Sequence, residues 1–376
     1  GEEIIGAFVE QWIANSIFVR PSYARIKPAC THYNTCGGCD LLHAKDDFVR
    51  NWRLALVGSA LRAQGIDAAV QFGHASPPHA RRRAKLTGQR TKSGAIVGFH
   101  ARAGSKVTSI PNCQVLTSGI LALLPWFEAL AREFASRKSA VEFQVTECAN
   151  GFDVDVTANK TPDPKNLIAL GAQMRAQAVQ RLTWNGEVLV QEAPPEVLFA
   201  DLVVQPPVGA FLQATQPAQE AMITRVLDDL RGAKRVIDLF AGCGTFALPL
   251  SQHSEVLAVE SEASALDALH AAWRRVGGLH KMATLTRDLF RSPLSGQDFD
   301  DFDAVVIDPP RAGAEAQFRA LAASTVAKIC SVSCNPVTFA RDARIAISGG
   351  YELRDVSVID QFRGSAHVEI QALFEK

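Results

Sequence analysis

The chain has 376 residues, 47% of them hydrophobic, which is enough to bury a sizeable core and predicts two or more domains. No run of about eighteen apolar residues occurs, which argues against a membrane span, and the N-terminus lacks the pattern of a secretory signal. Eight unevenly spread cysteines do not suit a disulfide scaffold, so we expect a reduced, cytoplasmic setting.

The net charge of zero conceals an uneven distribution. From Arg20 to Lys106 there are fifteen Lys and Arg residues against four Asp, a balance of +11, and the rest of the chain carries −11. The densest basic cluster consists of Arg81, Arg82, Arg83, Lys85, Arg90 and Lys92. It favours a polyanionic partner, with nucleic acid the first choice, and an ordinary solvated surface is the alternative.

The predicted elements fall into three regions. Residues 1–28 hold short strands (IIGAFVEQWI and SIFVR), interpreted either as a truncated small RNA-binding barrel or as strands packed on the body. Residues 29–200 hold the early cysteines, the basic cluster, helices near 47–64 and 120–135, and strand-like runs at 141–145 and 152–156. Residues 201–376 alternate apolar strands (RVIDLF, EVLAVE, AVVIDPP, KICSVSCNP) with helices, which predicts an α/β doubly wound parallel sheet.

Three early cysteines, Cys30, Cys36 and Cys39, lie within ten residues, and Cys113 is a candidate fourth ligand. Four thiolates suit either zinc or an iron–sulfur cluster. Zinc ribbons usually pair two C-x₂₋₄-C knuckles, so three close cysteines and one distant one favour a 4Fe-4S cluster, with zinc as the alternative. The C-x₃-C-x₂-C spacing of radical enzymes is absent, which favours a structural cluster.

A glycine turn follows the first strand of the C-terminal region, at 236–245. Gly242 and Gly244 allow the backbone to approach a ligand at the carboxyl end of that strand. Neither the third glycine of the dinucleotide fingerprint nor a phosphate-binding G-x-x-x-x-G-K-[ST] motif is present. The next strand ends at Glu260, which is suited to ribose hydroxyls, and Asp288 follows a third strand and could face an adenine. Over residues 235–345 this pattern resembles class I S-adenosylmethionine methyltransferases.

Two further strand ends carry reactive groups. Asp308-Pro-Pro-Arg311 presents a carboxylate and a guanidinium, and the absence of an aromatic at 311 argues against methylation of an exocyclic amine. Cys334 lies where the next strand gives way to Asn-Pro, at the ligand-binding edge, so we interpret it as a nucleophile. The other three late cysteines are expected to be structural: Cys148, Cys243 and Cys330.

A thiol is what methylation of uracil at carbon 5 requires. A thiolate that adds to carbon 6 makes carbon 5 electron-rich enough to attack a sulfonium methyl group. The adduct must then lose the carbon 5 proton to a general base, and Glu369 in the C-terminal strand is the candidate. Its alternative is a solvated glutamate on a strand face.

Taken together, these motifs resemble the RNA 5-methyluridine (uracil-C5) methyltransferase family, and in particular its iron–sulfur-containing 23S rRNA-type members. The matching segments are Phe211-Leu-Gln213, Asp238-Leu-Phe-Ala-Gly-Cys-Gly, Asp308-Pro-Pro-Arg-Ala-Gly, Ser333-Cys334-Asn-Pro, His367-Val-Glu369 and the four early cysteines. The resemblance implies a 4Fe-4S centre, makes Glu369 the base, and implies cofactor contacts from Gln213, Phe240, Thr245, Glu260, Asp288 and Asp308. One departure is Ala214-Thr215, where the family usually has a branched apolar residue and Asn.

We therefore expect S-adenosylmethionine-dependent methylation of carbon 5 of a uridine in RNA, in 23S rRNA or alternatively in tRNA. The target base must leave its stack, which favours a loop or bulge. We expect a monomer without a membrane partner. Two other hypotheses are a methyltransferase acting on a different acceptor, which would not need Cys334 or Glu369, and a non-enzymatic RNA-binding protein with a degenerate fold.

Overall fold

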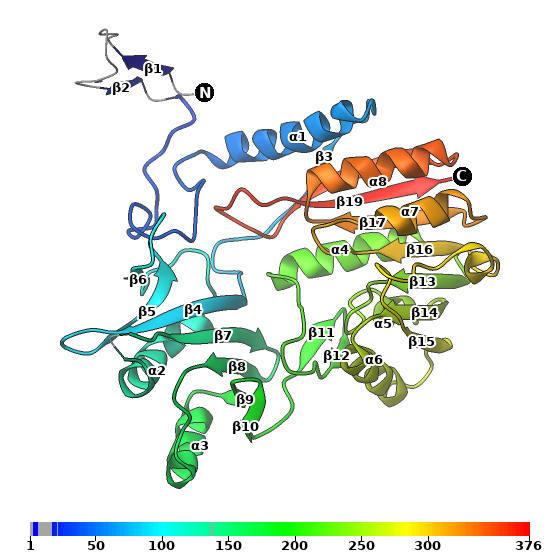
Figure 1. The fold of residues 1–376 in the computed structure, drawn as a ribbon. Coiled ribbons are helices and arrows are strands. Elements are labelled where there is room, and N and C mark those ends of the chain that lie inside the picture. The colour runs from blue at the N-terminus through cyan, green and yellow to red at the C-terminus, as the bar shows by residue number, and fades with distance from the viewer. Residues whose placement is uncertain (1–2, 7–16, 21, 137) are drawn as a thin grey trace.

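The structure is a computed structural model that describes residues 3–6, 17–20, 22–136 and 138–376. Strands β1 (Glu3–Gly6) and β2 (Ile17–Arg20) form an antiparallel pair near the N-terminus (Figure 1). Residues 7–13 of the first expected strand lie outside the described residues, so only its beginning can be compared with the structure.

The C-terminal part of the chain forms most of an eight-stranded sheet. Its strands are β3 (Gln71–Ala75), β13 (Arg235–Leu239), β14 (Glu255–Glu260), β15 (Met282–Thr286), β16 (Ala304–Ile307), β17 (Lys328–Ser333), β18 (Glu352–Asp360) and β19 (Glu369–Glu375). Their order is β15-β14-β13-β16-β17-β19-β18-β3. Strands β13 to β17 pair in parallel, and β19 runs antiparallel between β17 and β18. The predicted doubly wound parallel arrangement is confirmed.

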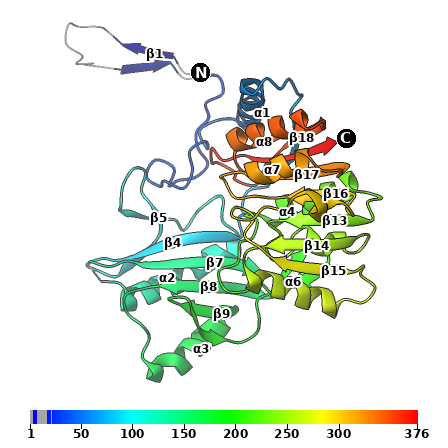
Figure 2. The same cartoon turned by 45° about the vertical axis from the view of Figure 1, so that its right-hand side comes forward.

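Helices cover both faces of this sheet (Figures 1 and 2). They are α1 (Asp46–Ala63), α4 (Gln216–Asp229), α5 (Ala247–Leu250), α6 (Ala263–Arg275), α7 (Glu315–Ala322) and α8 (Pro336–Ser348). Alternate residues of a strand point to opposite faces, so Val305 packs in the core under α1, α7 and α8 while Val306 packs in the core with α4, α5 and α6. Among the described helices, none is both long and apolar enough to cross a membrane.

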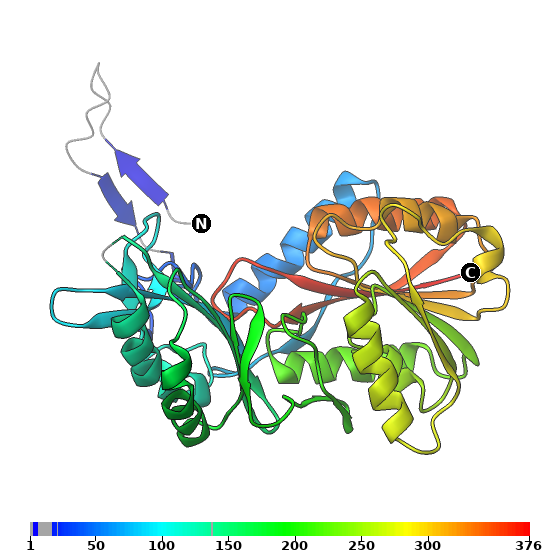
Figure 3. The same cartoon turned by 60° about the horizontal axis from the view of Figure 1, so that its bottom comes forward.

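A second, seven-stranded sheet is built from the middle of the chain. Its strands are β4 (Arg83–Arg90), β5 (Ala95–His100), β6 (Val107–Ser109), β7 (Val141–Cys148), β8 (Gly151–Thr157), β9 (Val179–Trp184) and β10 (Glu187–Gln191), in the order β10-β9-β8-β7-β4-β5-β6. Helices α2 (Ser118–Phe134) and α3 (Leu167–Ala176) pack on one face (Figure 3). Phe127 of α2 stacks on Phe143 of β7, with ring centroids 4.7 Å apart. The helices and strands expected in this region are confirmed.

Four short elements complete the fold. They are the 3₁₀ turns η1 (Pro164–Asn166) and η2 (Gly296–Phe299) and the antiparallel strands β11 (Val197–Phe199) and β12 (Leu202–Val204). The middle region is not confined to the second sheet, because α1 packs against α8 and β3 pairs in parallel with β18. The early chain therefore closes one edge of the C-terminal sheet.

Part of the basic cluster is used inside the protein. Arg82 is only 6% exposed; its guanidinium donates to Gln219 Oε1 at 2.7 Å and to the carbonyl of Gln213 at 3.4 Å, and its backbone N–H donates to Ala214 at 3.1 Å. The expectation that the whole cluster faces a polyanion is wrong for Arg82, because its side chain is consumed by contacts that join the second sheet to α4. Lys85, 63% exposed, pairs with Glu142 at 2.5 Å.

We predict that Arg82→Met lowers the free energy of unfolding by about 2–4 kcal/mol, because it leaves the buried Gln219 amide oxygen and a backbone carbonyl without their donor. Lys85→Met is the control and should change it by less than about 1 kcal/mol, since exposed ion pairs contribute little. Urea denaturation of both variants measures the difference. Equal, small losses would contradict a structural role for Arg82.

Candidate active site

The carboxyl ends of β13, β14 and β16 form one edge of the C-terminal sheet, and a turn after β13 shapes this edge. Phe240, Gly242 and Gly244 adopt positive φ angles of 63°, 52° and 92°. A Cβ on Gly244 would lie 2.3 Å from Leu269 Cδ1, whereas one on Gly242 would meet nothing within 4 Å. Buried Asp238 accepts the Ala247 N–H at 2.8 Å and thereby holds the turn. The turn leaves open space in front of Gly242, as a close-approaching ligand requires.

Acidic side chains follow the next two strands at this edge, and one of them contacts the turn. Glu260 Oε2 accepts the Gly242 N–H at 3.0 Å, and its Oε1 accepts the Ser261 N–H at 2.6 Å. Asp288 Oδ1 accepts the Phe290 N–H at 2.9 Å, and the Phe290 ring lies 5.5 Å from that of Phe240. The structure thus brings Gly242 and Glu260 into direct contact and links Asp288 to Phe240 through Phe290. This arrangement offers carboxylates for ribose hydroxyls and aromatic rings for an adenine.

Thr245, the remaining expected residue of the turn, is half-buried just before α5. Cys243, between the two glycines, is buried, and burial raises the pKa of its thiol to about 12. The structural role expected for this cysteine fits that environment.

A chain of hydrogen bonds joins the carboxylates on the reactive side. Gln213 Nε2 donates to Asp308 Oδ2 at 3.2 Å, and Gln213 Oε1 accepts from Gln361 Nε2 at 2.8 Å. Gln361 Nε2 also donates to Glu369 Oε2 at 2.7 Å. Glu369 is 3% exposed, so the alternative of a solvated glutamate is wrong. Gln361 was not predicted from the sequence; the available signal was its position eight residues before Glu369, directly after the preceding strand β18.

Burial raises the pKa values of both carboxyl groups in this chain. Burial raises the pKa of Asp308 to about 7, and the hydrogen bond from Gln213 acts in the opposite direction and lowers it. The pKa of Glu369 is raised to about 8 by burial and then by the negative charge of Asp308, while the hydrogen bond from Gln361 lowers it. Near neutral pH the pair therefore holds a proton, and Glu369 has the basicity suited to a general base.

Cys334 lies half-buried directly after β17. Burial, then the negative charges of Glu369 and Asp308, raises the pKa of its thiol to about 11, and Arg311 lowers it. The next residue, Asn335, caps α8 and donates to the Arg311 carbonyl at 3.0 Å, which ties the Cys334 loop to the Asp308–Arg311 loop. Thiol, two carboxyls and a guanidinium are thus gathered at one edge, as the sequence predicted.

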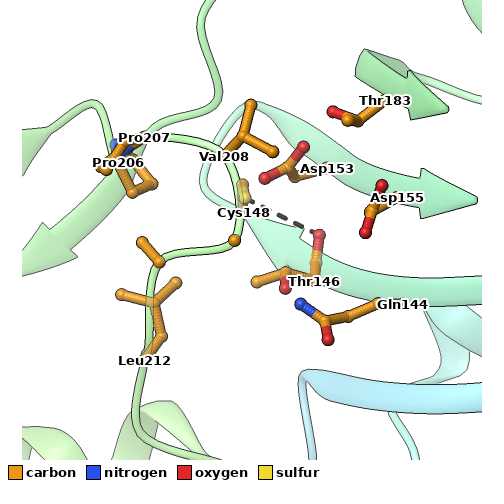
Figure 4. Close-up of a pocket in the computed structure, with 12 residues that line it drawn as sticks. Gln144, Thr146, Cys148, Asp153, Asp155, Thr183, Pro206, Pro207, Val208 and Leu212 are labelled. Carbon is orange, nitrogen blue, oxygen red and sulfur yellow. Dashed lines mark hydrogen bonds between the residues drawn. The ribbon is translucent and has the colours of Figure 1, made fainter. Parts of the chain in front are cut away.

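Cys148 and Cys330 lie elsewhere. Cys148 lines a cavity between β7, β8, β9 and residues 206–212, where its Sγ donates to the Thr146 carbonyl at 3.7 Å (Figure 4). Cys330 is fully buried in the core of the C-terminal sheet. Burial raises the pKa of each thiol to about 12, which keeps both protonated and suits the structural role expected for them.

The four early cysteines line a single cavity. Its remaining walls include Phe99, Ile110, Val115, Leu116, Tyr33 and Arg81. The Gly38 N–H donates to Cys36 Sγ at 3.4 Å. Burial raises the pKa of Cys36 and Cys113, and that of Cys39 to about 12, and the neighbouring thiols raise them further. In the described residues no group of three or more His, Cys, Asp or Glu side chains is placed so that it could hold a metal ion. The cavity thus brings the four thiols to one place in the fold.

Comparisons with known proteins bear on this site. Residues 196–376 match the family described as tRNA (Uracil-5-)-methyltransferase. The chain is 41% identical to an uncharacterized RNA methyltransferase of Mesorhizobium japonicum, over 100% of this chain and 91% of that protein. It is 30% identical to the 23S rRNA (uracil(1939)-C(5))-methyltransferase RlmD of Shewanella piezotolerans, over 93% of this chain and 82% of that protein.

A solved structure shares the fold. The tRNA (uracil-54, C5)-methyltransferase of Pyrococcus abyssi, in complex with S-adenosyl-L-homocysteine, superimposes with a TM-score of 0.75 at 21% identity. The match covers 100% of this chain and 92% of that one. At this identity the likeness establishes the fold.

The raised pKa of Glu369 leads to a prediction about stability. The folded state holds this proton up to about pH 8, whereas an exposed glutamate has an ordinary value of 4.5. The Glu369 carboxyl therefore makes its full contribution to stability below pH 4.5, its ordinary pKa. This contribution is lost as the pH rises through the pKa of about 8 that the group has in the folded state. Glu369→Gln should gain Tm relative to the unsubstituted protein by more at pH 8 than at pH 5.

Glu375→Gln, at the other end of β19, is the matched control, and its Tm difference should not grow between the two pH values. Differential scanning calorimetry at both values makes the comparison. A constant offset for Glu369→Gln would show that its carboxyl is ionised throughout.

Proposed function

This chain belongs to the RNA uracil-C5 methyltransferase family, and we propose that it methylates carbon 5 of a uridine in 23S rRNA, with Cys334 as nucleophile and Glu369 as base. The observation that carries these roles is the convergence of Cys334, Asp308 and Glu369 at the edge where β16 and β17 end. A methyltransferase acting on another acceptor would not need a buried thiol facing two carboxyls.

The residues account for the chemistry as follows. The Cys334 thiol first loses its proton to water. Its thiolate then adds to carbon 6 of the ring, and the electron pair of the carbon 5–carbon 6 double bond moves onto the ring as an enolate. Bound S-adenosylmethionine would supply the electrophilic methyl group for carbon 5 on its sulfonium, whose sulfur would keep the bonding pair and leave as a neutral thioether. Glu369 removes the proton from carbon 5, the double bond re-forms, and the bond between carbon 6 and Sγ breaks to regenerate the thiolate. Arg311 favours the Cys334 thiolate and so offsets part of the effect of burial and of the two carboxylates, which favour the protonated thiol.

The cofactor would occupy the edge between the glycine turn and the reactive groups. Glu260, with Oε1 and Oε2 already turned toward backbone N–H groups, would hold the ribose hydroxyls, and Asp288 and the Phe240 and Phe290 rings would hold the adenine. Gln213 and Asp308 would lie near the methyl group of the cofactor. The open space at Gly242 and the half-buried Thr245 would lie at the same end. Gly244 acts indirectly, because its missing Cβ lets Leu269 pack beneath the turn.

The choice of 23S rRNA rests on the similarity to the RlmD protein over most of both chains. In this proposal residues 201–376 are the catalytic domain. Residues 29–200 contribute RNA contacts and also supply α1 and β3, which pack on the C-terminal sheet. The aromatic side chain of Phe211 is 72% exposed and available to stack on a base. A uridine in a loop or bulge suits the half-buried Cys334, because the base must leave its stack to reach the thiol. A tRNA substrate is the alternative.

The early cysteines fit a 4Fe-4S cluster. Four thiols face one cavity with apolar walls, and a backbone N–H already donates to Cys36 Sγ, as is common around iron–sulfur ligands. In this proposal Cys30, Cys36, Cys39 and Cys113 hold the cluster, which supplies a structural centre rather than a reacting group. Because burial raises the thiol pKa values, the metal-free cysteines hold protons that cluster binding must displace. Zinc is the alternative occupant.

The cluster assignment predicts that protein purified without oxygen is brown and carries about four irons and four sulfides per chain. Cys39→Ser should lose the colour and most of the iron. Cys148→Ser, which alters a cysteine on the second sheet, should keep both. Elemental analysis with visible absorption makes the measurement, and colourless protein with one equivalent of zinc would replace the cluster by zinc.

The reaction predicts that the protein transfers labelled methyl groups from S-adenosylmethionine to unmodified 23S rRNA as 5-methyluridine. Cys334→Ala should lower the rate at least about 10³-fold, because the covalent route is lost, while Cys148→Ser should retain it. Nucleoside analysis of separate rRNA and tRNA reactions identifies product and substrate. Label confined to tRNA would move the substrate to that class, and label in another nucleoside would refute the role of Cys334.

A further inference from the structure

Gln361 occupies the centre of the hydrogen-bond chain on the reactive side, directly after β18. It is 2% exposed and contacts both the proposed base and the proposed cofactor-side glutamine. We infer that Gln361 is a positioning residue, which fixes the Glu369 carboxylate for proton abstraction by tying it to Gln213 and to the backbone of the Gln213 segment. The inference rests on the proposed function, since it deepens the role of Glu369.

The direction of each hydrogen bond is set by fixed groups at the two ends. The Ala214 backbone N–H donates to Gln361 Oε1 at 2.9 Å, so this oxygen must face Ala214 and the amide nitrogen must face the other way. The two N–H bonds of that nitrogen then match the two acceptors, Gln213 Oε1 at 2.8 Å and Glu369 Oε2 at 2.7 Å. Every polar atom of the Gln361 amide group is used.

The same argument orients Gln213. Its oxygen accepts from Gln361, so its nitrogen donates to Asp308 Oδ2 at 3.2 Å. A methionine or leucine at 361 would break this order, because Gln213 and Glu369 would both lose a donor in a buried place. Gln361 binds Oε2 of Glu369, and we assign the other oxygen, Oε1, to the proton of carbon 5.

The backbone that carries Gln361 is held firmly. Buried Arg53 of α1 pairs with Asp360 and donates to the Ser365 carbonyl at 2.8 Å. The N–H groups of Asp40 and Leu41 both donate to the Gly364 carbonyl, at 2.7 and 2.9 Å. The loop between β18 and β19 is therefore clasped by α1 and by the cysteine segment, so Gln361 cannot follow Glu369 if the carboxylate swings away. A fixed partner is what a positioning role requires.

The titratable groups that face Glu369 are Asp308, which follows β16, and Cys334, which follows β17. Arg311 is the charged group next to Cys334, and Gln361, which follows β18, is neutral. The hydrogen bond from Gln361 favours the ionised carboxylate and lowers its pKa. Without that bond, Glu369 should need a higher pH to act as a base. Removal of the carbon 5 proton should then become the slow step, after Cys334 is already bonded to the ring.

The test uses the full-length protein with Gln361→Met, which keeps the side-chain volume and removes both donors. We expect kcat to fall about 10- to 100-fold with a smaller change in KM, and the rising limb of the pH–rate profile to move to higher pH. A covalent protein–RNA complex that survives denaturing electrophoresis should accumulate, because Cys334 is released only after the proton is lost.

Gln371→Met is the matched control. Gln371 is a buried glutamine on the same face of β19, and its Nε2 donates to the Met222 carbonyl at 3.2 Å rather than to a site residue. This variant should lose stability yet keep the pH profile and accumulate no complex. Gln361→Asn is a second test variant, whose shorter amide should give the same changes in the same direction if Gln361→Met folds poorly.

The outcomes separate the inference from the proposed function. If the unsubstituted protein forms 5-methyluridine but Gln361→Met shifts neither the pH profile nor the amount of complex, the positioning role is refuted. If the unsubstituted protein forms none, the proposed function fails, and calorimetry still decides the inference. In that case, the Tm of the protein with Gln361 and of Gln361→Met is each compared across pH with the Tm of the same protein carrying Glu369→Gln. The pH range in which Glu369 lowers Tm should be higher in Gln361→Met. An unchanged range overturns the inference.

Discussion

Two carboxyl groups, Asp308 and Glu369, are held close together in a buried place where they cannot both ionise easily. The cost of burying them is met by amides rather than by cations, since Gln213 donates to one and Gln361 to the other. An arginine at either position would form an ion pair and lower the pKa of its carboxyl, which would weaken a base. Neutral donors satisfy one oxygen of each carboxyl and still leave the pair holding a proton near neutral pH.

This constraint explains why the site is assembled from so many parts of the chain. Asp308 and Cys334 come from the ends of adjacent parallel strands, Glu369 from an antiparallel strand inserted beside them, and Gln213 from the segment between the two sheets. Arg82 fixes that segment through the Gln213 carbonyl. The second sheet therefore acts on the chemistry through the backbone of Gln213, whatever its own contacts with RNA.

Much of the C-terminal half could be predicted from the sequence. Short apolar runs that end at Glu260, Asp308 and Cys334 already indicated parallel strands with polar ends. Each run is visible locally in the sequence, and the carboxyl ends of parallel strands share one edge of the sheet. Arg82 and Gln361 could not be assigned in this way. Their partners are far away in the sequence, and a surface arginine and a buried one look alike in a list of charges. The burial of Glu369 was likewise a property of the sheet order, which places β19 between two other strands.

The pairing of β3 with β18 has a consequence for how the chain reaches this state. During synthesis β3 is made long before its partner strand β18, in which Ser357 lies opposite Gln71. Until then β3 presents unpaired backbone groups, and the loop that holds Gln361 has no neighbour to clasp it. Such long-range pairings form slowly and expose strand edges to other chains in the meantime. The edge that carries Asp308, Cys334 and Glu369 should therefore be completed only once β18 and β19 have been made, late in folding rather than early.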